Sequence, residues 1–198
     1  MTEHKTQIQQ GWQPELADDV AQLYEQAFGH KFASAISDKT KRKAFLAKCF
    51  LADYSFVAMS QENVVGIAGF QTPDGTFTGG ITFEQIMAEL GWLRGLKACA
   101  VFSLFERKAQ EGELVMDGIA VDAECRGQGL GGKLLDQIID YARLHHYQRV
   151  RLDVIDSNPR AKKLYEAKGF VAEKTEHYPY LKWLLGFSGS TTMVYHIN

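Results

Sequence analysis

The chain has 198 residues, of which 45% are hydrophobic and 23% are charged. These values are ordinary for a globular protein, and we expect residues 1–198 to form a single domain with a substantial core. The net charge of −2 gives no electrostatic reason to expect a nucleic acid or an anionic membrane as a partner.

Two further features argue against other classes of protein. No apolar run approaches the ~20 residues that a membrane span needs, and the first residues lack the apolar core of a signal peptide. The three cysteines, Cys49, Cys99 and Cys125, are scattered and have no metal-ligand spacing. We therefore expect reduced thiols, a cytoplasmic location, no membrane partner and no bound metal.

The first part of the chain predicts a strand, two helices and a hairpin. The first helix begins at Pro14, where proline is favoured, and its apolar face ends at Gly29. The hairpin is indicated by two runs rich in β-branched and aromatic residues. The expected ranges are 5–10, 14–29, about 38–51, 54–59 and 63–72.

Residues 80–111 predict a helical insertion. Two segments with apolar faces, about 82–93 and 96–110, are separated at Gly95. Such an insertion can be a lid over a substrate, a contact in a homodimer, or additional core packing. We favour packing with some shaping of a substrate site.

Residues 114–135 predict a strand, a glycine-rich bend and a helix. The strand is the apolar run ending at Val121, the bend covers 126–132, and the helix is strongly amphipathic. Glycines allow close backbone approach to an anion, and the N–H groups of the helix N-terminus attract it. This stretch therefore predicts a binding site for a phosphate group.

Two general phosphate-binding patterns match the bend incompletely. A mononucleotide P-loop requires Ser or Thr where Leu134 stands. A dinucleotide motif matches Gly127, Gly129 and Gly132, but five residues separate the strand from the first glycine, and only 66 residues follow the last. That is too few for a doubly wound sheet.

The remainder predicts a strand, a helix and two more strands. The helix that follows the glycine-rich bend joins two strands by what we expect to be a right-handed parallel crossover. The next helix opens at Asn158-Pro159 and closes at Gly169. The expected strands are 150–155, 170–175 and 191–197.

Two motifs in this half resemble those of the GNAT superfamily of acyl-CoA-dependent N-acetyltransferases. The first is Arg126-x-x-Gly129-x-Gly131. The second is Asn158-x-x-Ala161-x-x-x-Tyr165-x-x-x-Gly169-Phe170. The resemblance covers roughly residues 114–176. It implies an α/β fold, a single domain with a mixed central β-sheet flanked by helices, here with the helical insertion at about 80–111.

The resemblance also implies a site for acetyl-CoA. The pyrophosphate would be bound by the backbone of the bend and by the charge of the arginine, with residues Arg126, Gly127, Gln128, Gly129, Leu130 and Gly131. The thioester carbonyl would be polarised by the backbone of Ile119, Ala120 and Val121. Asn158 would lie beside the cofactor or cap its helix.

Two side chains are candidates for proton transfer. In the family, a tyrosine at the position of Tyr165 protonates the departing thiolate, and packing is the alternative role. An amine acceptor is mostly protonated at neutral pH, so a base is useful. We predict Asp117 as this base. In a regular strand, Asp117 and Glu113 would lie on the same face as Ile119 and could therefore face the cleft.

The predicted function is transfer of the acetyl group of acetyl-CoA directly to a primary amine of a small molecule, peptide or protein. One alternative is a non-catalytic acyl-CoA-binding or interaction module on the same fold. Another is a dinucleotide-binding oxidoreductase. The aromatic segment 178–187 is either a binding surface for the acceptor or buried packing.

Overall fold

The fold is described from a computed structural model of the chain, which describes residues 6–33, 35–105, 109–179 and 187–197. Its strands form one sheet in the order β1-β2-β3-β5-β6-β8-β7, with β4 paired to β3. The strands are β1 (Gln7–Gln10), β2 (Ser55–Ser60), β3 (Asn63–Thr72), β4 (Gly75–Thr76), β5 (Glu113–Val121), β6 (Arg149–Ile155), β7 (Val171–His177) and β8 (Gly189–His196).

Among the described residues, β5 and β6 form the parallel pair, and the other paired strands are antiparallel. The helix α5 joins β5 to β6, as expected for a parallel crossover. The sheet is therefore mixed, unlike the parallel sheet of a dinucleotide-binding domain.

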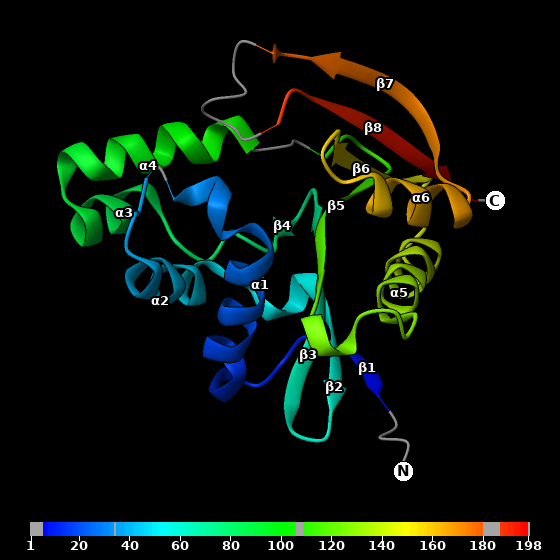
Figure 1. Cartoon of the computed structure of the whole chain (residues 1–198), viewed down its shortest axis with the longest axis horizontal. Coiled ribbons are helices and arrows are strands. Elements are labelled where there is room, and N and C mark those ends of the chain that lie inside the picture. Colours follow the sequence, from blue (N-terminus) through cyan, green and yellow to red (C-terminus); the bar gives the residue numbers. More distant parts are fainter. Residues whose placement is uncertain (1–5, 34, 106–108, 180–186, 198) are drawn as a thin grey trace.

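The helices cover both faces of the sheet, and α1 to α4 lie on the side opposite α5 and α6 (Figure 1). They are α1 (Ala17–Phe32), α2 (Lys39–Cys49), α3 (Phe83–Leu90), α4 (Trp92–Phe105), α5 (Leu130–Leu144) and α6 (Pro159–Ala167). This arrangement confirms the predicted α/β fold with a mixed sheet flanked by helices.

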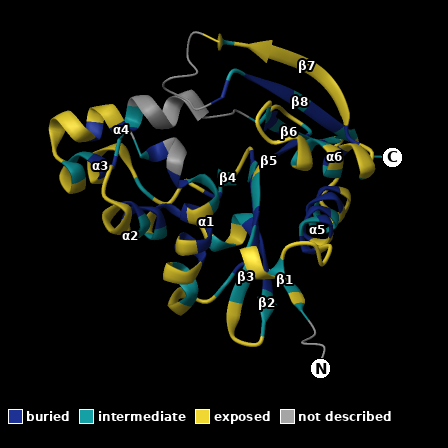
Figure 2. Cartoon of the chain, in the orientation of Figure 1, coloured by how far each residue is buried: buried dark blue, intermediate teal, exposed yellow. Residues whose placement is uncertain are grey.

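Each face of the sheet has its own apolar core (Figure 2). The face toward α5 and α6 buries Leu134, Ile138 and Leu152. The opposite face buries Phe45 and Phe77 among the side chains of α1 to α4. Because both faces are covered, the ends of the central strands are held by packing from two sides.

The first α-helix begins and ends three residues later than predicted, at Ala17 and Phe32, after a turn of 3-10 helix at Pro14–Leu16. Gly29 does not end it, and α1 continues to Phe32. The side chain of Glu25 lies over Gly29, where a Cβ atom would be only 2.2 Å from the Glu25 carboxylate oxygen. Gly29 is thus a packing position and not a helix stop.

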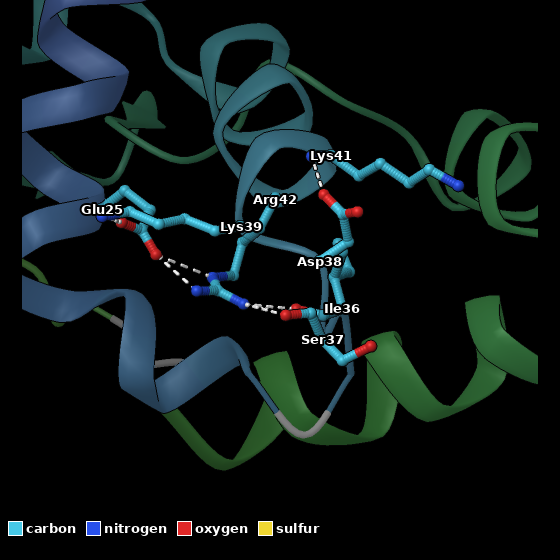
Figure 3. A network of polar contacts seen from close by, with 7 residues as sticks. All are labelled: Glu25, Ile36, Ser37, Asp38, Lys39, Lys41 and Arg42. Carbon is cyan, nitrogen blue, oxygen red and sulfur yellow. Dashed lines mark hydrogen bonds and ion pairs between the residues drawn. The ribbon is translucent and has the colours of Figure 1, made fainter.

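The buried carboxylate of Glu25 joins α1 to α2 (Figure 3). It accepts a hydrogen bond of 3.1 Å from the Nε of Arg42 and a second, shorter one from the same guanidinium. Arg42 also donates to the backbone carbonyls of Ile36 and Ser37. The position of α1 is therefore fixed by a buried, fully bonded ion pair.

The insertion is helical, but its break lies elsewhere than predicted. The two helices meet at Gly91, whose φ of +75° favours glycine. Gly95 lies inside α4 and is buried against Met87, whose sulfur would be 2.7 Å from an added Cβ. None of the helices described is long and apolar enough to cross a membrane.

Candidate active site

The predicted phosphate-binding bend is a turn between β5 and α5, which we call the glycine turn (residues 126–131). Gly127 and Gly129 have φ of +83° and +76°, a region that side chains rarely adopt. Gly129 is the N-cap of α5 and has no side chain to bond the first N–H groups of the helix. Those N–H groups are therefore available to an anion.

The glycine turn also leaves room for a ligand. A Cβ atom added to Gly127 or Gly129 would have no protein atom within 4 Å. The Nε of Arg126 donates to the carbonyl of Val121 at 3.1 Å, which places the guanidinium beside the end of β5. Residues 126–129 are exposed, whereas Leu130 is buried and anchors the helix. The turn therefore has open space beside the N-terminus of α5 for an anionic group.

The strands β5 and β6 separate beside this turn. Their parallel ladder covers only Glu113 to Val115 of β5. Beyond it, β5 stays paired with β3 as far as Val121, and β6 stays paired with β8 as far as Ile155. The backbone of Ile119, Ala120 and Val121 therefore belongs to the part of β5 that has left β6, as the predicted carbonyl-polarising role requires.

A β-bulge in β5 changes which way its side chains point. The register with β3 shifts between Gly69 and Phe70, opposite Gly118 and Met116, so Asp117 is the extra residue of β5 at the bulge. Ile119 packs into the core beneath α5, whereas Asp117 and Gly118 face α1. The prediction that Asp117 and Ile119 lie on the same face of the strand is therefore wrong, because the bulge reverses the alternation of side chains between the two faces.

On the α1 side, Asp117 is next to two aromatic rings. The hydroxyl of the buried Tyr24 lies 3.5 Å from a carboxylate oxygen of Asp117. The ring of Phe28 covers Gly118, where an added Cβ would be 2.8 Å from it. Burial first, and then the charge of Asp117, raise the pKa of Tyr24 well above its usual value, so Tyr24 stays a neutral donor.

Glu113, the other acid of this strand, is part of the structure of the sheet. Its side chain is 1% exposed and lies 3.0 Å from the Nε of Arg149 and 3.2 Å from the Nε of Arg151. Both arginines belong to β6, at the short ladder that joins it to β5. Glu113 thus ties the two strands together below the point where they separate, and it is not a candidate base.

The helix α6 carries the other predicted residues. The Asn158 side chain accepts a hydrogen bond of 3.1 Å from the N–H of Ala161, so it caps the helix. Tyr165 is 7% exposed and packs against Phe170. Its hydroxyl makes no hydrogen bond to another described residue. Burial raises the pKa of Tyr165 to about 12, which keeps the phenol protonated.

The structure brings the glycine turn, the separated strand and α6 together. A Cβ on Gly131 would lie 3.5 Å from Leu164, 3.9 Å from Val121 and 4.0 Å from Ile119. Leu164 directly precedes Tyr165. Tyr165 belongs to the apolar core against which Ile119 and Val121 also pack. Asp117 lies on the other face of the sheet, toward α1. The candidate acid and the candidate base are therefore on opposite faces, with β5 between them.

Sequence reasoning missed Tyr24 as a neighbour of Asp117, and it missed the arginines that bind Glu113. Tyr24 has no signal beyond its place on an apolar helical face. Arg149 and Arg151 alternate on β6, which indicates one face of the strand but not its partner. Most of the aromatic segment 178–187 lies outside the described residues. No cluster of possible metal ligands occurs within the described part of the chain.

Comparison with known proteins identifies the family. Residues 17–170 match the model of the acetyltransferase (GNAT) family. The chain is 30% identical over 81 residues, 40% of its length, to the spermine/spermidine N(1)-acetyltransferase of Bacillus subtilis (strain 168). The matched segments span only 39% to 53% of the curated relatives' own lengths.

Solved structures share the fold over nearly the whole chain. An N-acetyltransferase from Staphylococcus aureus Mu50 is 17% identical, with a TM-score of 0.64 and coverage of 98% of this chain and 99% of that one. The yncA protein of Salmonella typhimurium, solved with its cofactor acetyl-CoA, is 18% identical, with a TM-score of 0.61 and coverage of 98% and 94%. At these identities the likeness shows the fold alone. The family match over residues 17–170, together with the glycine turn and the separated strands, establishes that the chain belongs to the acetyltransferase (GNAT) family.

Proposed function

We propose that this protein transfers the acetyl group of acetyl-CoA directly to a primary amine of a small molecule, peptide or protein. The observation that carries the proposal is the placement of an open glycine turn beside the point where β5 leaves β6. An anion bound at the turn and a thioester beside the free edge of β5 would belong to one extended ligand. Acetyl-CoA would supply the activated acyl group.

Different residues of the chain would bind different parts of acetyl-CoA. The backbone N–H groups of 126–131 and the charge of Arg126 would bind the diphosphate. Asn158 would act on the cofactor side only through the start of α6, which it caps. The backbone of Ile119 to Val121 would donate to the thioester carbonyl, where negative charge develops during attack.

The proton transfers are assigned to two side chains. Asp117 would take a proton from the amine on the α1 side, which leaves the nitrogen lone pair free to attack. The new N–C bond forms as the C–S bond breaks, and the hydroxyl of Tyr165 would donate a proton to the departing sulfur. The nitrogen would lose its second proton to water, and the phenolate of Tyr165 would take a proton back from solvent. Burial keeps the phenol of Tyr165 protonated, as a proton donor must be, and Tyr165 lies on the face of the sheet toward α5 and α6, from which acetyl-CoA would enter.

The proposal is tested by incubating the protein with acetyl-CoA and a panel of amines, which covers small amines, diamines, polyamines and peptides with a free N-terminus or lysine. Release of free thiol together with an acetylated amine, detected by mass spectrometry, is the expected result. Turnover by the wild type that is lost in Tyr165→Phe supports the assignment. Binding of acetyl-CoA without acetylation of any amine would favour the alternative of a non-catalytic acyl-CoA-binding module.

A further inference from the structure

The first turns of α4 present large apolar side chains to solvent. Trp92, Leu93 and Leu96 are 66%, 82% and 42% exposed. Phe83, at the start of α3, is 48% exposed. We call Trp92, Leu93 and Leu96 the apolar stripe of α4. Exposed apolar side chains scattered singly are ordinary, but three within five residues of one helix call for an explanation.

In the part of α4 whose side chains the structure describes, residues 92–99, the packing is the reverse of what a helix on the surface of a monomer needs. The buried residues of this part are the small ones, Gly95 and Ala98. Trp92, Leu93 and Leu96, which would gain most from burial, point away from the protein. Gly95 lies so close to Met87 of α3 that no larger residue would fit there. The structure thus fixes the apolar stripe outward.

The charges beside the apolar stripe are positive. At about 100° per residue, the stripe covers an arc of about 100°, and Lys97 and Arg94 follow within about the next 100°. Both side chains are exposed, and neither forms an ion pair with any residue that the structure describes. The acids of α3 are already engaged, because Glu89 pairs with Lys48 at 2.7 Å and hydrogen bonds from its own N–H and from Thr82 lower the pKa of Glu84.

The hairpin of α3 and α4 also projects from the body of the molecule. Its tip, at Gly91, is exposed, and the exposed residues of α3 and of the first turns of α4 lie at the end of the molecule away from α5 and α6 (Figure 2). A projecting stripe with aromatic and leucine side chains next to lysine and arginine has the composition of helices that lie in a membrane interface.

We propose that the apolar stripe of α4, with Arg94 and Lys97, binds the surface of an anionic lipid membrane without crossing it. A second copy of this chain is a poorer partner, because a two-fold contact centred on the stripe would bring Arg94 and Lys97 close to their own copies. Anionic headgroups instead neutralise both cations while the apolar side chains enter the acyl boundary. The net charge of the whole chain does not oppose this binding, because screening limits attraction to charges near the surface.

The test is co-flotation of the full chain with vesicles of phosphatidylcholine alone or with 30% phosphatidylserine, a composition that we choose as about the anionic content at which such binding is clear. We expect binding to the anionic vesicles that weakens as salt is raised. The double variant Trp92→Ser/Leu93→Ser should bind at least tenfold more weakly. The variant Arg94→Gln/Lys97→Gln should lose the preference for anionic lipid.

The matched control is Leu144→Ser, which removes an isolated leucine, 74% exposed, at the end of α5. It should bind vesicles as the wild type does, and circular dichroism of each variant shows whether the fold is retained. The proposal is overturned if the wild type does not float with anionic vesicles, or if the Trp92→Ser/Leu93→Ser variant binds as well as the wild type. A wild-type dimer that this variant converts to a monomer, without vesicle binding, would instead assign the stripe to a second copy.

Discussion

At the scale of single residues, the account depends on Tyr165 and Asp117. Tyr165→Phe removes only a hydroxyl, so we expect the affinity for acetyl-CoA to stay within about twofold while kcat falls about 100-fold, a typical contribution of a positioned acid. Steady-state kinetics and calorimetry measure the two quantities. Tyr141→Phe, in a tyrosine whose ring packs on Phe70, is the matched control and should leave both unchanged.

Asp117→Asn should reduce kcat/KM about 100- to 1,000-fold near neutral pH, because the amine would then have to lose its proton without a base. A lysine-like amine has a pKa of about 10.4, so the activity of the variant should keep rising as the pH increases toward that value. A pH profile of the variant parallel to that of the wild type would contradict the role of Asp117.

The buried phenol also makes stability depend on pH. Burial raises the pKa of Tyr165 to about 12, whereas an unfolded tyrosine titrates near 10. Between these values the unfolded chain has lost the proton and the folded chain keeps it, so the free energy of unfolding falls by about 1.4 kcal/mol per pH unit on account of this residue. Urea denaturation at pH 9 and at pH 11 should show a correspondingly smaller loss for Tyr165→Phe than for the wild type.

At the scale of elements, the ion pairs of Glu113 hold β5 and β6 together at the short ladder that joins these two strands. Glu113→Ala removes a buried carboxylate from beside two guanidinium groups that are 30% and 20% exposed, and we expect a loss of about 3 kcal/mol in the free energy of unfolding, the lower end of the range for a buried pair. The control is Asp140→Ala, which removes an exposed partner of Arg143 and should cost less than about 1 kcal/mol. Equal losses in chemical denaturation would contradict the buried role of Glu113.

Sequence patterns predicted most of these elements, because amphipathic periodicity and capping residues such as Asn158 and Pro159 act locally. What failed depends on neighbours distant in the sequence. The bulge at Asp117 arises from its register with β3, and Gly29 and Gly95 are packing sites for Glu25 and Met87. A glycine read alone indicates a break, whereas in these two helices it makes room for a side chain.

The glycine turn was predictable because its chemistry is local: glycines, an arginine and a helix N-terminus follow one another in the chain. The placement of Asp117 and Tyr165 on opposite faces of the sheet was not, because it needs the bulge, the separation of β5 from β6 and the packing of α1. The two motifs therefore indicated the family, and the three-dimensional structure was needed to place the two candidate side chains on opposite faces of the sheet.

At the scale of the whole molecule, helices pack on both faces of a sheet whose central strands separate beside the glycine turn. The central claim is that this turn binds acetyl-CoA. The measurement that tests it most directly is calorimetric titration of acetyl-CoA into the wild type and into Gly129→Glu, which places a carboxylate in the space that Gly129 leaves open.

Gly91→Glu is the matched control, because Gly91 has nearly the same φ, +75° against +76°, and equally open surroundings, but lies at the tip of the α3–α4 hairpin. We predict that the wild type and Gly91→Glu bind acetyl-CoA alike and that folded Gly129→Glu loses at least about 100-fold in affinity, since a charge-assisted contact becomes a repulsion. Failure of the folded wild type to bind acetyl-CoA, or unchanged binding by Gly129→Glu, would contradict the claim.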